Sequence, residues 1–156
     1  MKIASKARVR AAPALLAPLY LDASALSKLY MAEPESDSLN RALRGRRDLH
    51  VSDLAITEIV SALARRRREG LLPADVPPRL HATILAHLEA GLFHRVELIA
   101  QVHREAERLL LTLEVRAADS LHLALALAAG ARTFVTYDRR QAAAARRSGL
   151  NIWPGD

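Results

Sequence analysis

The sequence predicts an α/β domain in which a parallel sheet is flanked by helices on both faces, and three observations lead to this fold class. The chain of 156 residues has the size of one ordinary domain. Short apolar segments alternate with longer helical ones, which is the pattern of strands joined by helical crossovers. The chain holds 30 Ala and 27 Leu but only 8 Val and 6 Ile, so we expect many helices and few, short strands.

Each expected element has a local signal. Strands are short apolar or alternating runs, and helices begin at capping residues or proline and end at glycine. In chain order, the elements are a strand at Leu19–Asp22, helices at Ser24–Met31 and Pro34–Arg44, a strand at Leu49–Ser52, helices at Leu54–Arg68 and ending at Ala90, a strand at Phe93–Leu98, helices at Ile99–Leu113 and Ala117–Ala129, a strand at Thr133–Thr136, a helix at Arg139–Ser148 and a strand at Leu150–Trp153.

Particular residues set these boundaries. Ser24 is expected to cap the first helix, and either Ser52 or Asp53 the long third one. The prolines at 73, 77 and 78 interrupt the chain before the fourth helix. The segment Ala117–Ala129 is apolar nearly all round, so we expect that helix to be central. In sheets of this kind, ligands bind beyond the carboxyl ends of the strands, so functional residues are sought there.

Charge and composition exclude some classes of function. The absence of cysteine excludes disulfides, thiolate zinc sites and cysteine nucleophiles, and fits a reducing cytoplasm. Aromatic residues make up only 4%, which speaks against base-stacking platforms. Four of the 23 Lys and Arg residues precede Asp22, so the rest of the chain has 19 cations against 17 Asp and Glu residues and is nearly balanced. The net charge of +6 therefore argues only weakly for a nucleic-acid partner.

Residues 1–17 are expected to form a loosely ordered extension, or to lie upstream of the native start, before a domain at 18–156. The extension has a basic start and a proline-containing apolar run, without a clear cleavage site for a signal peptide. No segment approaches the roughly 20 apolar residues that a membrane helix needs. We therefore expect a cytoplasmic protein that makes no membrane contact.

Four carboxylates stand at or near the expected strand ends. Asp22 ends the first strand, Glu58 lies in the helix after the second, Asp119 lies in the first turn of the apolar helix, and Asp138 follows the fourth strand. Each alone is explained as a cap, a helix-start residue or a solvated residue. Glu58 and Asp119, however, lie in segments otherwise poor in charge, where a carboxylate must be paired, protonated or metal-bound.

A group of carboxylates repels itself, so its ionisation requires a cation. Ligands that are all oxygen select a hard ion such as Mg²⁺ or Mn²⁺. The sequence has no HExxH motif and no histidine pair at a spacing of four, so zinc is not favoured.

Four blocks of sequence resemble the PIN-domain ribonucleases, most closely the VapC-type toxins of bacterial toxin–antitoxin pairs. The resemblance covers nearly everything from Leu19 to Pro154, and it is carried by the order and spacing of the blocks. The N-terminal extension departs from the family pattern, which usually starts just before the first strand. The blocks are Tyr20–Leu26 with Lys28–Tyr30 and Glu33–Ser36, then Thr57–Leu63, Arg116–Ala124 and Thr133–Asp138.

The resemblance implies a five-stranded parallel sheet and an acidic site that holds Mg²⁺, with Mn²⁺ as a substitute. Its metal-binding and catalytic residues by position are Asp22, Glu58, Asp119 and Asp138. Ser24 and Thr136 are implied to support the site by hydrogen bonding to carboxylates or bound water. The resemblance also implies a homodimer and inhibition by an antitoxin encoded beside the toxin.

The chemistry expected of this site is hydrolysis of an RNA phosphodiester by a metal-activated water. Arginines near the site are expected to hold the RNA backbone, and the candidates are Arg65 to Arg68, Arg139 and Arg140. The run from Arg65 to Arg68 is equally explained as a solvated helix end that suits the helix dipole. The six histidines are interpreted as structural or surface residues; they are His50, His81, His87, His94, His103 and His122.

Three other functions compete with a ribonuclease toxin. One is a PIN nuclease that processes RNA without being a toxin. Another is a PIN module that binds RNA or protein without cutting, which loses ground because all four acids are present. A Mg²⁺ phosphatase of the HAD type is disfavoured, because that family needs a second Asp two residues after the first and this chain has Ser24 there.

Overall fold

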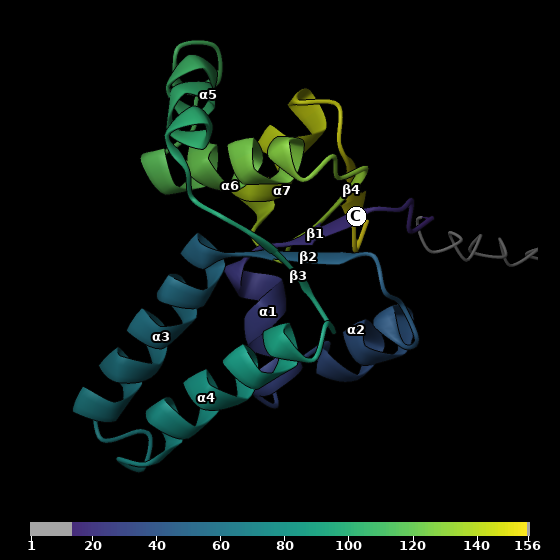
Figure 1. Ribbon diagram of the computed structural model, residues 1–156. Helices are drawn as coiled ribbons and strands as arrows, with labels where there is room; N and C mark the ends of the chain where they lie inside the picture. Colours follow the sequence, from purple (N-terminus) through teal and green to yellow (C-terminus); the bar gives the residue numbers. More distant parts are fainter. Residues whose placement is uncertain (1–13, 156) are drawn as a thin grey trace, which may run out of the picture.

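In the computed structural model, which describes residues 14–155, five parallel strands form one sheet in the order β3-β2-β1-β4-β5 (Figure 1). The strands are β1 (Leu19–Leu21), β2 (Leu49–Ser52), β3 (His94–Val96), β4 (Thr133–Val135) and β5 (Asn151–Trp153). The predicted parallel sheet is thus confirmed. The strand order reverses at β1, and open α/β sheets bind ligands in the crevice at such a switch point.

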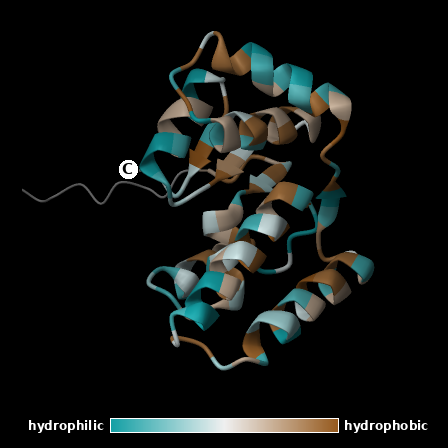
Figure 2. Cartoon of the chain, turned by 90° about the vertical axis from the view of Figure 1, so that its left-hand side faces the viewer, coloured by the Kyte–Doolittle hydropathy of each residue, from teal (hydrophilic) through white to brown (hydrophobic). Residues whose placement is uncertain are grey.

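Helices cover both faces of the sheet, as predicted. They are α1 (Ala23–Tyr30), α2 (Ser36–Leu43), α3 (Asp53–Arg68), α4 (Val76–Glu89), α5 (Ala100–Leu110), α6 (Ala117–Ala128) and α7 (Arg139–Arg147). The first four lie on one face and the last three on the other (Figure 1). Most helices carry hydrophilic and hydrophobic residues side by side, as expected of helices with one buried and one solvent-facing side (Figure 2).

The core is split into two clusters by the sheet, because successive strand residues point to opposite faces. Leu19 and Leu21 of β1 belong to the cluster under α1 to α4. Tyr20, between them, belongs to the cluster under α5 to α7, together with Phe134. Helix α6 supplies several buried residues of this second cluster, including the fully buried Leu123, which confirms its predicted central place.

The cap of α1 differs from the prediction. Asp22 caps this helix, because its Oδ1 accepts a hydrogen bond from the Ala25 N–H at 3.0 Å. Ser24 lies in the first turn instead and donates its hydroxyl to the same oxygen at 2.7 Å. Both residue types cap helices, and the strand ends one residue earlier than predicted. For α3, Ser52 rather than Asp53 is the capping residue, with Oγ accepting from the Ala55 N–H at 3.1 Å.

Two further boundaries were predicted incorrectly. Pro77 and Pro78 lie within the first turn of α4 rather than before it, where the missing N–H has no helical partner to lose. Strand β3 is shorter than predicted, and its residues His94 and Arg95 are exposed at the sheet edge. Gly130 ends α6 as predicted, with a φ of 64° that a residue with a side chain rarely adopts.

The last four residues of the predicted extension, 14–17, lie against the domain. The Thr133 hydroxyl donates to the Leu16 carbonyl at 2.7 Å, and the Asn151 amide donates to the Ala14 carbonyl at 2.7 Å. Residues 1–13 of that prediction lie outside the described residues. Within the described part of the chain, no helix has both the length and the apolar character needed to span a membrane.

Candidate active site

The carboxyl edge of the central strands carries a buried carboxylate, Asp22, only 4% exposed. Leu21 pairs with Val135 of β4, so the next residues, Asp22 and Thr136, stand at one level. Thr136 donates its hydroxyl to Asp22 Oδ2 at 2.5 Å, while Oδ1 accepts from Ser24 and from the backbone of α1. Burial raises the pKa of Asp22 above its ordinary range, and the nearby His122 and these hydrogen bonds oppose that rise.

Asp138 is held at the same edge by the loop after β4. The Thr136 hydroxyl accepts the Asp138 N–H at 3.0 Å, and the Ser24 hydroxyl accepts the Tyr137 N–H at 2.8 Å. Asp138 then caps α7, with Oδ1 accepting from the N–H groups of Arg140 at 2.8 Å and the following residue at 3.1 Å. The two hydroxyl side chains therefore hold Asp22 and Asp138 in one connected network.

Asp119 lies in the first turn of α6 and is half-buried. Its Oδ2 accepts a long hydrogen bond from the Arg116 N–H at 3.4 Å, as in a capping box. The Gln141 amide, from α7, donates to the Asp119 main-chain carbonyl at 3.2 Å. The helix starts that carry Asp119 and Asp138 are thereby joined.

Glu58 projects from the second turn of α3 and meets α6 through a histidine. Its Oε2 lies 2.8 Å from Nε2 of His122, and the side chains are 36% and 5% exposed, respectively. The sequence interpretation kept His122 out of the site, and the structure corrects this, because His122 is buried and contacts one of the four acids. The signal was the spacing of three between Asp119 and His122, which places both on one side of a helix.

The structure thus brings all four acid-bearing segments to one edge of the sheet. The side chains of the four acids suit Mg²⁺, because each of them offers carboxylate oxygens as ligands. Among residues 14–155, however, no three His, Asp or Glu side chains are grouped so as to hold a metal ion. The carboxylates are engaged instead with hydroxyls, helix N-termini and His122.

The candidate RNA-binding arginines fall into two places. Arg139 and Arg140 begin α7 beside Asp138, and the Arg140 guanidinium lies 3.9 Å from that carboxylate. Arg65 and Arg68 lie in the last turns of α3, which leads away from the sheet (Figure 1). At 1.5 Å per helical residue, they are roughly 10 to 15 Å beyond Glu58 along the axis, so the structure separates them from the acids.

Two arginines that the sequence argument missed lie closer to the acids. Arg116 and Arg147 line a cavity of about 500 Å³ together with Asp119 and Arg140. Arg147 follows Arg140 by seven residues, or two helical turns, so both lie on one side of α7. This spacing was the available sequence signal for Arg147. The carboxyl edge therefore combines acids with an adjoining basic wall.

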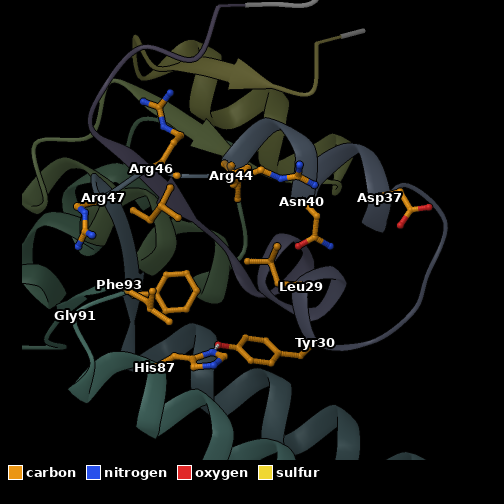
Figure 3. A pocket seen from close by; sticks show the side chains of 14 residues that line it. Leu29, Tyr30, Asp37, Asn40, Arg44, Arg46, Arg47, His87, Gly91 and Phe93 are labelled. Atoms are coloured by element: carbon orange, nitrogen blue, oxygen red, sulfur yellow. Dashed lines mark hydrogen bonds between the residues drawn. The ribbon is translucent and has the colours of Figure 1, made fainter.

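A wider cavity of about 720 Å³ lies at the opposite, amino edge of the sheet and contains none of the four acids (Figure 3). Arg44, Arg46 and Arg47 stand on one side of it, and Tyr30 and His87 on another. The Tyr30 hydroxyl lies 2.7 Å from His87 Nδ1. Cavity volume alone would therefore place a ligand site at the amino edge rather than at the carboxyl edge.

Known proteins match the chain over most of its length. Residues 19–147 match the PIN domain family. The chain is 32% identical over 124 residues to ribonuclease VapC3 of Pyrobaculum aerophilum, a match that covers 80% of this chain and 92% of that protein. It is 33% identical over 142 residues to ribonuclease VapC46 of Mycobacterium tuberculosis, covering 88% of this chain and 97% of that one.

The fold recurs in a solved structure of low sequence identity. VapC20 of Mycobacterium tuberculosis, a toxin that cleaves the sarcin-ricin loop, superposes with a TM-score of 0.63 at 17% identity, over 81% of this chain and 94% of that one. This likeness concerns the fold.

Proposed function

Because the chain belongs to the PIN domain family, we propose that it is a ribonuclease of the VapC type, which hydrolyses internal phosphodiester bonds of RNA and acts as the toxin of a toxin–antitoxin pair. The observation that carries this proposal is that the four acid-bearing segments lie at the carboxyl edge of the sheet, where the buried Asp22 shares one hydrogen-bond network with Asp138. The names of the two ribonucleases at 32% and 33% identity support the same reaction.

The proposed cofactor is Mg²⁺, with Mn²⁺ as a substitute, held by Asp22, Glu58, Asp119 and Asp138. When bound, such an ion promotes ionisation of a water molecule and offsets charge that develops on the phosphoryl oxygens. Two properties of the chain support this assignment: the donors are all carboxylates, and burial disfavours the charge of Asp22, which a cation would compensate. Ser24 and Thr136 keep the Asp22 carboxylate in one orientation through their hydrogen bonds.

The RNA backbone is proposed to cross the basic wall beside Asp119. Arg116, Arg140 and Arg147 line that cavity, and guanidinium groups bind phosphates through paired N–H donors. Arg139 adds a further cation at the start of α7. This placement brings a phosphodiester to the acids while its neighbouring phosphates contact arginines.

Cleavage of a structured RNA tests the enzymatic part. We expect cleavage with Mg²⁺, none with EDTA, and recovery with excess Mn²⁺. The variant Asp119→Asn is expected to be inactive, while the matched control Asp75→Asn, an exposed acid paired with Arg79 on α4, keeps full activity. Wild-type cleavage by Asp119→Asn would remove this residue from the site.

The toxin part is tested in cells. Expression of the chain alone is expected to arrest growth, and coexpression of the neighbouring small gene to restore it. We propose that this antitoxin inserts an Arg among the four acids, where its guanidinium pairs with the carboxylates. A homodimer in the cytoplasm is proposed on the family resemblance. If growth is unaffected while purified protein still cuts RNA, the RNA-processing function takes the place of the toxin.

A further inference from the structure

A chain of hydrogen bonds links strands β2 and β1 to helix α6 and ends on Glu58 of α3. We propose that His122 is a positioning residue that fixes the Glu58 carboxylate at the carboxyl edge, and that Tyr20 and Ser52 hold its imidazole in place. The inference deepens the proposed ribonuclease function and rests on it for its kinetic consequences. The hydrogen bonds from which it is argued are formed by the protein's own residues, without a bound ligand.

The links are short and come from different elements. The Ser52 hydroxyl, at the end of β2, lies 2.7 Å from the Tyr20 hydroxyl of β1. The same Tyr20 oxygen lies 2.8 Å from His122 Nδ1 on α6, and His122 Nε2 lies 2.8 Å from Glu58 on α3. Tyr20 and Ser52 are fully buried and His122 is 4% exposed, so only the Glu58 end reaches solvent.

The donors and acceptors fix the direction of the chain. An ionised Glu58 can only accept, so His122 donates from Nε2, and a neutral imidazole then accepts at Nδ1 from the Tyr20 hydroxyl. Burial raises the pKa of Tyr20 well above its ordinary value, which keeps that proton on the phenol. The Tyr20 oxygen then accepts from Ser52, whose own oxygen accepts the Ala55 N–H at 3.1 Å. The Tyr20 and Ser52 hydroxyls thereby each donate one hydrogen bond and accept one.

The chain closes a loop on α3. Ser52 caps this helix and Glu58 lies on it, while Tyr20 is two residues before Asp22 on β1. The loop therefore sets the distance between the helix that carries Glu58 and the strand that presents Asp22. A partly exposed glutamate normally loses side-chain rotamer freedom when it binds a metal ion. Here the hydrogen bond to His122 has already removed that freedom in the folded protein.

A purely structural role makes a different prediction from a positioning role. If the chain only stabilises the core, its loss lowers the free energy of unfolding and leaves the turnover of the folded enzyme unchanged. If it positions Glu58, its loss lowers kcat, and this loss disappears when Glu58 is already disabled. Outer partners of metal-binding side chains typically contribute about 10- to 100-fold, so the two roles are separable.

The molecule offers a matched control for the kinetic test. Tyr30 also places its hydroxyl on a histidine Nδ1, at 2.7 Å, but at the amino edge. Tyr20→Phe is expected to lower kcat for RNA about tenfold or more, with KM within about twofold. Tyr30→Phe is expected to change neither constant beyond about twofold, and Tyr20→Phe is expected to add nothing in a Glu58→Gln background. Equal kcat for the two Phe variants, in an active wild type, overturns the inference.

His122 variants cover the case in which Tyr20→Phe fails to fold. His122→Gln keeps a side-chain N–H near the position of Nε2, and His122→Leu removes it. We expect His122→Gln to keep more of the wild-type kcat than His122→Leu does. Equal loss in both folded variants contradicts a role through hydrogen bonding.

A spectroscopic measurement separates failure of this inference from failure of the proposed function. In metal-free protein, the ring nitrogens of His122 are expected to report a proton on Nε2, and the Nε2 signal is expected to shift in Glu58→Gln. A proton on Nδ1, or a signal insensitive to Glu58→Gln, overturns the positioning role. If the wild type does not cut RNA while the Nε2 signal follows Glu58, the ribonuclease proposal fails and the positioning of Glu58 stands.

Discussion

The two edges of the sheet each contain a Tyr–His hydrogen bond, and they differ in what lies beyond the histidine. At the carboxyl edge, Tyr20 and His122 are buried and the imidazole continues to Glu58. At the amino edge, Tyr30 and His87 form a stacked pair with ring centroids 5.6 Å apart between α1 and α4 (Figure 3). Among the described residues, no carboxylate is hydrogen-bonded to His87. Only the pair at the carboxyl edge is connected to one of the four acids, Glu58.

The edges also differ in the kinds of charged residue that they carry, which a net charge of +6 does not reveal. The carboxyl edge carries the four acids beside the arginines of the basic wall, whereas Arg44, Arg46 and Arg47 line the amino-edge cavity. Arg46 is paired there with Asp48 through two hydrogen bonds of 2.9 and 2.6 Å. The difference predicts that changes at the carboxyl edge alter the chemistry, while changes at the amino edge alter stability only.

The largest effect is expected from Asp22→Asn. Loss of this carboxylate should lower RNA cleavage by more than about 100-fold, since it removes one of the four ligands proposed for the metal ion that offsets charge in the transition state. Asparagine still caps helices, so the variant should fold. Kinetics together with circular dichroism check this, and a folded variant with wild-type turnover would exclude Asp22 from the reaction.

A smaller effect is expected from the basic wall. Arg140→Ala and Arg147→Ala should each weaken RNA binding several-fold and reduce the slope of log K against log salt by about one. Arg65→Ala and Arg68→Ala serve as matched controls, because they lie along α3 away from the acids. RNA affinity measured at several salt concentrations checks this. Equal losses of affinity in the two pairs of variants would indicate that the RNA also contacts α3.

Shortening the chain tests the amino edge. A protein that begins at residue 18 loses the hydrogen bonds of Thr133 to Leu16 and of Asn151 to Ala14. At about 0.5 to 1.5 kcal/mol for each bond, its free energy of unfolding should fall by about 1 to 3 kcal/mol relative to a chain that begins at residue 14. Both should cut RNA with equal kcat, and denaturant titration with kinetics checks this.

The smallest effect is expected at the Arg46–Asp48 pair. Hydrogen bonding to Arg46 lowers the pKa of Asp48, so the folded state favours its ionised form. This contribution is fully present above the unfolded pKa near 3.8 and is lost as the pH falls through the lower folded pKa. Because the pair is partly solvated, Asp48→Asn should cost less than about 1 kcal/mol at pH 7, with no difference from wild type at the acid end of an unfolding series.

Much of the fold followed from the sequence, because strands and helices left local signals. Glycine at the end of α6 and the apolar length of that helix are readable from neighbouring residues. The cap of α1 was not, since Asp22 and Ser24 are equally good capping types and only the end of β1 decides between them. The place of Pro77 and Pro78 was also ambiguous, because proline both breaks helices and opens them.

The site could be predicted only in part. Asp22, Glu58, Asp119 and Asp138 stand out because each follows a strand or lies in an apolar segment. His122 stands out only by its spacing of three from Asp119, since its partners Tyr20 and Glu58 lie 102 and 64 residues away and no local pattern indicates these contacts. Arg147 shows a similar limit: its spacing of seven from Arg140 places both on one side of α7, but the packing of α7 beside Asp119 is what brings that side near the acids.

The location of a bound divalent ion tests the central claim most directly. A crystal of the wild-type protein soaked in Mn²⁺ is expected to show an anomalous peak at the carboxyl edge, within bonding distance of Asp22 and at least one of Glu58, Asp119 and Asp138. No such peak is expected at the amino-edge cavity between Tyr30 and Arg44. A peak at the amino edge, or none near Asp22 in a protein that cuts RNA with Mn²⁺, would contradict the assignment of the active site.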